Sequence, residues 1–348
     1  MRLRLAGSLF AALILGGSVA VSGCKAPAAA VDAPSSQPVA APAPAAPVSV
    51  DRASVSLEGV RVHLTIDDVP YMTERGTPMR LSPEDTLALN QRLIGVLGQH
   101  DVAASVFVVC DRLREGDGTL AVWHQAGHAV GNHTHSHAPL NRLGPEAWLA
   151  DAAACHETIE GRIGADVAWL RYPYLGYGNG AEARDAATAG LAELGERTAP
   201  VTIATTEWMY AYAYRRALAA DDRARADAVV ADFHAHMDEA LREGVAMAAE
   251  VPGRDVPQTV LVHMNELVAD EIGTLVARWK AQGVVFVDLP TAMADPVFAM
   301  DNHYAGTGGV SWLKRIRTAE DPPRPYWFGQ TEGPIIEKWG PMPVKGEE

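Results

Sequence analysis

The sequence predicts an α/β fold in which parallel strands alternate with helices. Seven short apolar segments rich in β-branched residues are separated by longer segments with helical periodicity. Strands that alternate with helices pair in parallel through right-handed crossovers. The hydrophobic content of 48% is that of a globular chain. Seven strand–helix units favour a (β/α) barrel over an open sheet.

The expected elements follow one another along residues 60–289. Strands are expected at 60–66, 103–109, 128–132, 167–172, 200–204, 259–263 and 284–289. Helices are expected at 83–99, 117–126, 145–163, 180–195, 206–247 and 268–282. Ser82 followed by Pro83 is a typical helix start, because serine caps the helix and proline fits its first position. The long segment 206–247 is interpreted as an insertion or a lid, with His234 and His236 on a solvated face.

The N-terminal residues are expected to lie outside the barrel. Residues 1–24 begin with a short basic region, continue with an apolar stretch and end at Cys24, which is the layout of an export signal. The letters VSGC resemble a bacterial lipobox, which implies lipidation of Cys24 and anchoring to the cell envelope, with Lys25 favouring the outer membrane. The alternative is an ordinary signal peptide with a chance cysteine.

The rest of the chain divides by composition. Residues 25–53 are rich in proline and alanine and are expected to form an extended tether. Residues 54–295 form the predicted barrel. Residues 296–348 lose the alternation, are rich in glycine, proline and aromatic residues, and are predicted to pack outside the barrel or at its edge as an irregular extension.

The charge balance argues against a nucleic-acid partner. The chain has 29 basic and 43 acidic residues, and without the first 24 residues the balance is 27 against 43, a net charge of −16. Such an acidic surface repels polyanions. Cys110 and Cys155 both lie in apolar surroundings, where either free buried thiols or a disulfide would fit. The sequence leaves the oligomeric state open.

Polar side chains follow several of the predicted strands. The carboxyl ends of parallel strands in a barrel meet at one mouth, so residues at these ends are expected to converge. The residues at five strand ends are Asp67 and Asp68, His133 and His137, Arg171 and Tyr174, Trp208, and His263.

Three of these residues suit a divalent metal. A catalytic metal needs three protein ligands and an open position, and imidazole with carboxylate suits zinc, cobalt or nickel. His133 and His137 are four residues apart, so we expect both on one side of a helical turn that Pro139 ends. Asp68 can complete the triad. A capping or surface role for the histidines is the alternative.

Asp67 is the candidate general base. A strand end that turns into Val69–Pro70 can present Asp67 beside Asp68, so that one carboxylate binds metal and the other stays free. A base must reach the attacking water, which a metal makes more acidic. Arg171 nearby would keep Asp67 ionised.

Four motifs in order resemble those of the polysaccharide deacetylases, the NodB-homology esterases of carbohydrate esterase family 4. They are TIDDVP, HTHSH, RYPY and LVH, and the resemblance runs over residues 60–293. It implies a distorted (β/α)7 barrel. It also implies roles for individual residues: Asp67 as base, Arg171 orienting it, Asp68, His133 and His137 as metal ligands, the Tyr174 amide at the oxyanion, Leu261 at the acetyl methyl, His263 as general acid, and Trp208 kept from the fourth motif.

The chain departs from this family pattern in two places. Val69 stands where a glycine is usual, so the loop there is expected to follow another path. Ala204 and Glu207 stand where aspartates are common. If Glu207 did not reach His263, the pKa of that histidine would not be tuned and the rate would fall.

The resemblance implies a metal-dependent hydrolase, with zinc favoured, that removes N-acetyl groups from a glycan of the cell envelope or the environment. Peptidoglycan, chitin-type oligomers and exopolysaccharide are the expected substrates, and acetate and a free amino sugar the products. Two alternatives stay open. One is hydrolysis of a non-glycan amide or other C–N bond at the same site, and the other is a catalytically idle glycan-binding lipoprotein.

Overall fold

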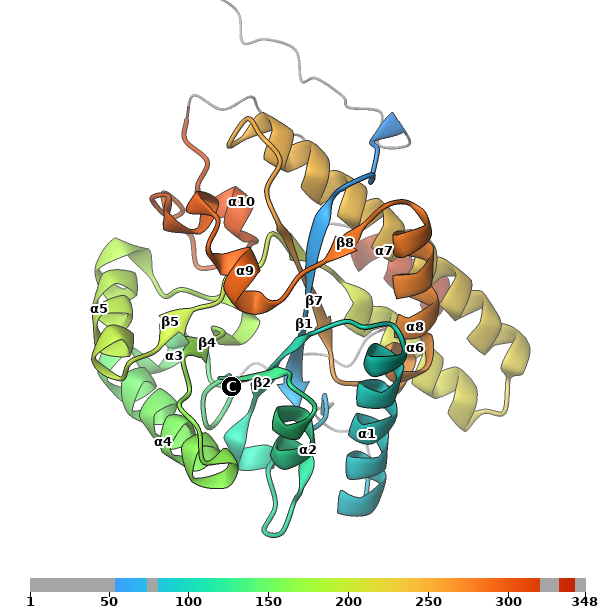
Figure 1. Ribbon diagram of the computed structural model, residues 1–348, viewed down its shortest axis with the longest axis horizontal. Coiled ribbons are helices and arrows are strands. Elements are labelled where there is room, and N and C mark those ends of the chain that lie inside the picture. Colours follow the sequence, from blue (N-terminus) through green and yellow to red (C-terminus); the bar gives the residue numbers. More distant parts are fainter. Residues whose placement is uncertain (1–53, 74–80, 320–331, 342–348) are drawn as a thin grey trace, which may run out of the picture. The chain divides into compact units, whose positions relative to one another are not determined.

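A computed structural model describes residues 54–73, 81–319 and 332–341 of the chain. The export signal, Cys24 and the tether therefore lie outside the described residues. The described part contains eight strands, all paired in parallel within one curled sheet (Figure 1). They are β1 (Arg61–Val69), β2 (Ser105–Val108), β3 (Ala129–Asn132), β4 (Trp169–Leu170), β5 (Arg197–Thr198), β6 (Ile203–Ala204), β7 (Gln258–His263) and β8 (Val285–Phe286).

The order of the strands confirms the predicted distorted (β/α)7 barrel. Their path is β5-β4-β3-β2-β1-β7-β6, with β8 paired to the start of β1. This is the cyclic order of the strands in a seven-stranded barrel. Among the described strands, β5 and β6 are not paired with each other, so the barrel is open between them. The two-residue strand β5 was not predicted, because two residues cannot show a periodicity.

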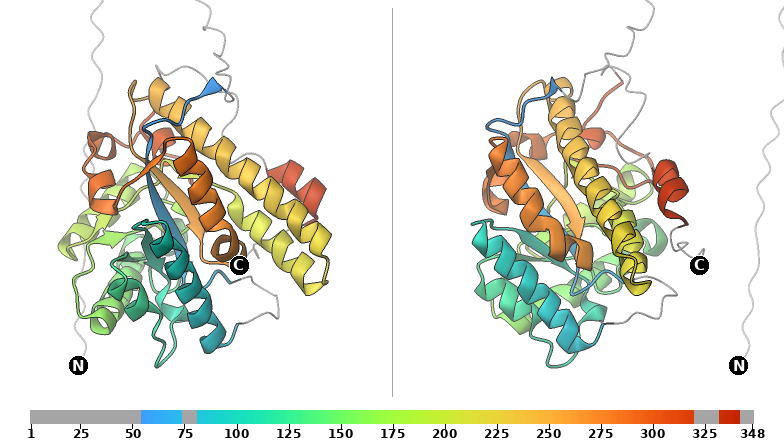
Figure 2. Two further views of the ribbon diagram at one scale, coloured as in Figure 1. Left: turned by 45° about the vertical axis from the view of Figure 1, so that its right-hand side comes forward. Right: turned by 90° about the vertical axis from the view of Figure 1, so that its right-hand side faces the viewer.

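Helices cover the outside of the sheet (Figures 1 and 2). The longer ones are α1 (Pro83–Gln99), α4 (Pro145–Ile163), α5 (Gly180–Glu193), α6 (Glu207–Ala219), α7 (Arg223–Glu250) and α8 (Glu266–Ala281). The shorter ones are α2 (Thr119–Gln125), α3 (Leu140–Leu143), α9 (Leu289–Met293), α10 (Trp312–Arg315) and α11 (Glu332–Trp339), with 3₁₀ turns η2 (Cys110–Arg112), η3 (Pro173–Leu175) and η4 (Pro296–Ala299). Within the described ranges, no helix has both the length and the apolar character needed to cross a bilayer.

Strand β1 lies in the middle of the sheet and of the core. Every residue from Val62 to Val69 is buried, as expected for a parallel strand covered on both faces. β1 pairs with β7 from Val62–Gln258 through Asp67–His263. The strand therefore runs three residues further than predicted, and the two carboxylates lie inside it rather than after it.

The predicted single segment 206–247 is wrong in two respects. It is two helices, because the chain turns at residues 220–222 and the Asp222 carboxylate caps α7 by accepting a hydrogen bond from the Arg225 amide, 3.0 Å away. Both helices also contribute to the main hydrophobic core, with Met209 and Phe233 among its buried residues. The segment is thus part of the helical layer and not a lid.

The predicted solvated face of α7 is also wrong. His234 and His236 are buried between α7 and its neighbours. His234 Nε2 lies 2.8 Å from Glu271 Oε2 on α8, and His236 Nε2 accepts a hydrogen bond from the Thr206 amide at 3.2 Å. One ring nitrogen of each histidine contacts a polar partner on another element, which sequence periodicity does not reveal.

Two further contacts tie distant segments together. Cys110 and Cys155 form a disulfide with 5.4 Å between their Cα atoms, which joins η2 to α4. At the interrupted side of the barrel, the Trp312 amide of the C-terminal extension donates to the Val201 carbonyl at 2.6 Å. Within the described residues, the extension therefore contacts the edge of the barrel at Trp312.

Candidate active site

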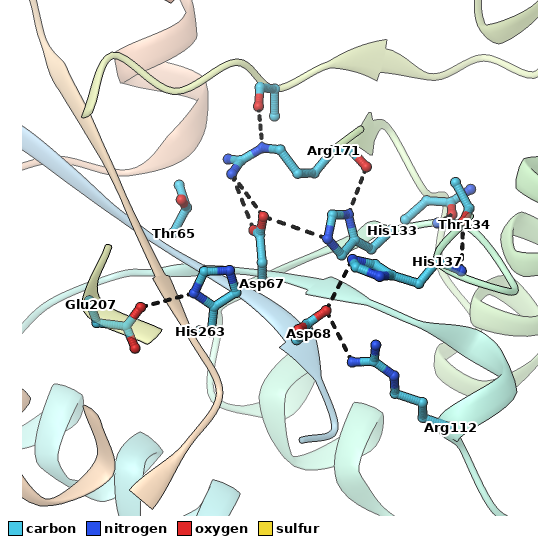
Figure 3. A network of polar contacts seen from close by, with 12 residues as sticks. Thr65, Asp67, Asp68, Arg112, His133, Thr134, His137, Arg171, Glu207 and His263 are labelled. Atoms are coloured by element: carbon cyan, nitrogen blue, oxygen red, sulfur yellow. Dashed lines mark hydrogen bonds and ion pairs between the residues drawn. The ribbon is translucent and has the colours of Figure 1, made fainter. Parts of the chain in front are cut away.

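The polar residues at the carboxyl ends of β1, β3, β4 and β7 converge on one cluster (Figure 3). Most of these side chains are buried. The members of the cluster are Asp67, Asp68, Arg112, His133, His137, Arg171, Glu207 and His263.

A bulge in β1 lets two consecutive carboxylates face the same cluster. In a regular strand, neighbouring side chains point to opposite faces of the sheet. Here the pairing with β2 shifts between Ile66 and Val69, and Asp68 has a left-handed φ of 66°. Val69 is buried and lies in the strand, so the left-handed position is at Asp68 and position 69 does not need a glycine.

Asp68, His133 and His137 form a group that could hold a metal ion. Their ligand atoms all lie within 4.8 Å of one another. Asp68 Oδ1 is 3.3 Å from His137 Nε2. His133 Nδ1 donates to the Arg171 carbonyl at 2.8 Å, which leaves His133 Nε2 as the ligand atom and holds the ring in place.

His133 and Asp68 are also in the protonation states that a metal ion requires of its ligands. Burial lowers the pKa of His133 well below its usual value, so the ring is neutral and able to coordinate. Burial raises the pKa of Asp68, but the charges of Arg112 and His137 outweigh it and lower the pKa overall. Buried Asp68 Oδ1 makes no hydrogen bond to the described residues, although Arg112 Nη1 lies 3.0 Å away. A buried carboxylate oxygen that carries negative charge and accepts no hydrogen bond is suited to bind a cation.

The loop that carries the two histidines is not the helical turn that the sequence predicted. Thr134 and His137 have left-handed φ values of 65° and 59°. The Thr134 amide donates to Asn132 Oδ1 at 2.8 Å, and the His137 amide donates to Thr134 Oγ1 at 3.1 Å. These side chains replace the backbone bonds of a helix. The histidine rings still meet, with 4.8 Å between their centroids.

The Asp67 carboxylate is bound by Arg171. Arg171 Nη1 lies 3.2 Å from both Asp67 oxygens, and Arg171 Nε donates to the Ala199 carbonyl at 2.6 Å. The guanidinium also lies 4.5 Å from the centre of the Phe107 ring. Burial raises the pKa of Asp67 to about 6 even though Arg171 opposes the shift. Asp67 Oδ2 is 3.7 Å from His133 Nε2, so this carboxylate lies beside the metal ligands.

Although Ala204 and Glu207 depart from the aspartates common in the family pattern, Glu207 does reach His263. His263 Nδ1 donates to Glu207 Oε2 at 2.9 Å, and the carboxylate also accepts from Asn265 Nδ2 at 2.6 Å. Burial lowers the pKa of His263, but Glu207, together with the charges of Asp68 and Asp67, outweighs burial and raises the pKa to about 9. Ala204 instead packs against the apolar cluster of Leu261 and its neighbours.

Of the three residues expected around the substrate, Tyr174 contacts this cluster, and Leu261 and Trp208 pack among apolar side chains. Tyr174 is 47% exposed, and its ring lies 4.6 Å from that of His137. Leu261 is buried on β7. Trp208 lies in the first turn of α6, next to Glu207, and packs edge to face on Tyr212, with 5.6 Å between the ring centroids.

Two contributors were missed by sequence reasoning. Arg112 lies beside Asp68, and Asn132 accepts a hydrogen bond from the histidine loop at the Thr134 amide. Arg112 follows the predicted strand 103–109, so the rule of polar residues at strand ends could have found it. Asn132 is the last residue of the predicted strand 128–132, so the same rule could have found it.

Comparison with protein families agrees with this geometry. Residues 55–194 match the family model described as polysaccharide deacetylase. This part of the chain is a polysaccharide deacetylase domain. The matched range holds Asp67, Asp68, Arg171 and the two histidines of the loop, whereas Glu207 and His263 lie beyond it.

Several solved structures resemble the deacetylase domain at low identity. The family 4 carbohydrate esterase from Streptomyces lividans in complex with acetate is 18% identical over 67% of this chain and 95% of its own, with a TM-score of 0.44. A mutant of the peptidoglycan deacetylase PdaC from Bacillus subtilis is 20% identical over 68% and 90%, with a TM-score of 0.43. A CE4 family pseudoenzyme from Bacillus anthracis is 18% identical over 66% and 64%, with a TM-score of 0.42. No curated protein matches the chain in sequence.

Proposed function

We propose that the chain is a metal-dependent hydrolase that removes N-acetyl groups from a glycan. The observation that carries this proposal is that a carboxylate bound by arginine and a histidine bound by glutamate both lie next to the candidate metal triad. Next to the triad, Arg171 binds the carboxylate of Asp67, and Glu207 binds and favours the protonated form of His263 (Figure 3). Amide hydrolysis requires a proton acceptor and a proton donor beside a metal site.

Asp68, His133 and His137 are the residues that would hold the metal. The donor set suits zinc best, with cobalt or nickel as substitutes. A divalent ion held there would polarise the acetyl carbonyl and make the attacking water more acidic.

In the proposed reaction, Asp67 and His263 transfer the protons. Asp67 accepts a proton from water as the water oxygen bonds to the acetyl carbon. The Tyr174 amide donates a hydrogen bond to the carbonyl oxygen as its negative charge develops. His263 protonates the amine nitrogen as the C–N bond breaks, which releases acetate and the amino sugar. Leu261 lines the space for the acetyl methyl group.

The decisive experiment measures metal content and acetate release on the same purified protein. Acetylated chito-oligomers and peptidoglycan serve as substrates. We expect about one metal per chain, and in Asp67→Asn a loss of acetate release of about 10²–10⁴-fold with the metal retained. Asp227→Asn, at an exposed position on α7, is the matched control. A protein that binds metal but releases acetate from no glycan would instead support a non-glycan amide substrate or an idle binding protein.

We also propose that Cys24 carries a lipid that anchors the domain to the cell envelope. The support is the order of basic region, apolar stretch and VSGC in residues 1–24. Labelling of cells with a radioactive fatty acid should mark the full-length protein. Cys24→Ser should abolish the label, and an equally labelled variant would contradict the anchor.

A further inference from the structure

The turn at Pro173–Leu175 needs support from its surroundings. Tyr174 has φ 56° and ψ 17°, and Leu175 has φ 51°. Two consecutive residues with side chains in the left-handed region are unfavourable by themselves, because Cβ crowds the backbone. Such a conformation persists where neighbouring groups hold it.

A buried arginine of the C-terminal extension contacts this turn. Arg315 is only 1% exposed, and its Nη2 donates to the Leu175 carbonyl at 2.6 Å. Its guanidinium lies 3.8 Å from the centre of the Tyr177 ring, just after the turn, and 5.2 Å from that of Tyr304. One side chain thus holds the turn by a charged hydrogen bond and by stacking.

A glycine of the extension touches the same turn from its backbone. A Cβ atom built on Gly309 would lie 1.9 Å from the Tyr174 carbonyl oxygen and 3.0 Å from the Tyr174 carbonyl carbon. Only a residue without a side chain lets the two backbones approach this closely. The extension therefore lies directly against the residue proposed to bind the oxyanion.

The extension is itself anchored and can act as a firm support. The Arg315 carbonyl accepts from the amides of His303 and Tyr304 at 2.7 and 3.2 Å. Trp312 Nε1 donates to the Val297 carbonyl at 2.7 Å, and Trp312 and Leu313 are buried against the end of α7. Figure 1 shows α10 next to α9, on the side of the sheet that holds β4 and β5.

We propose that the segment 302–316 positions the turn at Pro173–Leu175, with Arg315 and Gly309 as its positioning residues. The inference rests on the proposed function, because the Tyr174 amide belongs to this turn. The segment lies outside residues 55–194, which match the family model, so this support is a feature of the rest of the chain. It acts on catalysis by fixing where the amide points, without touching the substrate.

The test uses Arg315→Met, Arg315→Lys and Gly309→Ala in the full chain. We expect kcat to fall about tenfold or more, with KM within about twofold of the wild type and the bound metal unchanged. Arg315→Lys should recover part of kcat, since an ammonium can still reach the Leu175 carbonyl. Arg254→Met is the matched control, because Arg254 forms an exposed ion pair with Asp295 at 2.5 Å, before the segment.

Hydrogen exchange measured by mass spectrometry provides a readout that does not need activity. The Leu175 and Gly176 amides donate within the turn, to the Tyr172 and Pro173 carbonyls. In Arg315→Met, the peptide containing them should exchange about tenfold faster, while peptides of β1 and β7 keep their wild-type rates. If Arg315→Met does not fold, Gly309→Ala, which adds one methyl group, carries the test.

The outcomes separate the two proposals. Unchanged exchange at the turn, or faster exchange with an unchanged kcat, would overturn the positioning role. An equal fall of kcat in Arg254→Met would also overturn it, because the effect would then be general. Wild-type protein that releases no acetate would contradict the proposed function, and exchange at the turn would still decide whether the extension holds it.

Discussion

Glu207 shows how one residue sets the chemistry of another. It is fully buried, and its two oxygens accept from His263 and Asn265. Burial alone would make His263 neutral at pH 7, but the adjacent carboxylate favours the charged ring. In the proposed mechanism His263 is the general acid and must carry its proton when the substrate arrives, and Glu207 would take the place of the aspartate that is common in the family pattern.

Replacement of Glu207 by glutamine should change the pH dependence of acetate release. In the wild type, His263 loses its proton as the pH rises through about 9, so kcat/KM should fall above that pH. Glu207→Gln should move this alkaline limb to lower pH by at least one unit and reduce the rate at pH 8. Glu271→Gln is the control, because Glu271 binds His234 at 2.8 Å in a similar pair outside the cluster. An unmoved limb would show that His263 is not the titrating acid.

The same pair links stability to pH. The pKa of His263 is raised above its usual 6.5 to about 9. Its contribution to the free energy of unfolding should therefore be fully present below pH 6.5 and be lost as the pH rises through about 9. Urea unfolding of the wild type and Glu207→Gln at pH 6 and pH 10 should show a larger difference at pH 6. An equal difference at both values would contradict the linkage.

At the scale of elements, the site is shaped by two irregular segments: the bulge of β1 and the loop after β3. The loop is held by the turn η2 and by helix α4. The Asp111 amide donates to the His135 carbonyl at 2.9 Å, and Asp151 Oδ2 accepts from the Ser136 amide at 3.0 Å. The Cys110–Cys155 disulfide joins these two supports.

Removal of this disulfide should therefore affect both stability and metal binding. The cysteines are 45 residues apart, and a cross-link of that length stabilises a fold by about 4 kcal/mol in the chain-entropy description. A Cys110→Ala, Cys155→Ala double variant should lose about 2–4 kcal/mol in urea unfolding and bind zinc more weakly in a chelator competition. Reduced wild type should behave in the same way. Unchanged zinc affinity would show that the loop does not depend on the cross-link.

At the scale of the whole molecule, a bound metal would join β1 to the loop after β3. Asp68 and His137 are far apart in sequence, yet their ligand atoms lie 3.3 Å apart. A ligand that binds only the folded state stabilises it by mass action, by about 2.7 kcal/mol at one hundred times its Kd. The metal should therefore contribute to the stability of the entire domain.

Chelation should accordingly lower Tm, and added zinc should restore it. His133→Ala should show a reduced Tm that zinc does not change, because one ligand is lost. His124→Ala, at an exposed position of α2, should respond to zinc as the wild type does. Thermal unfolding followed by circular dichroism checks these outcomes, and a wild-type Tm indifferent to both chelator and zinc would contradict the metal site.

Local signals predicted much of the fold. Helices α1 and α4 begin and end where the sequence indicated, because each starts with a proline at its first position and has a clear apolar periodicity. The parallel pairing of the strands followed from the alternation of strands and helices. The prediction of a helical turn from His133 to His137 failed because the side chains of Asn132 and Thr134 accept the backbone hydrogen bonds there. The prediction of a solvated face on α7 failed because His234 and His236 are buried against other elements.

The sequence by itself determined which chemical groups are present and which end of the barrel carries them. Asp67, Asp68 and the histidines follow from motifs of a few residues, because strand ends in a parallel barrel must converge. Only the tertiary structure decided the pairings that tune these groups. Glu207 with His263 and Arg315 with Leu175 are 56 and 140 residues apart, and contacts at such separations leave no local periodicity. They depend on how the helices and the extension pack around the sheet.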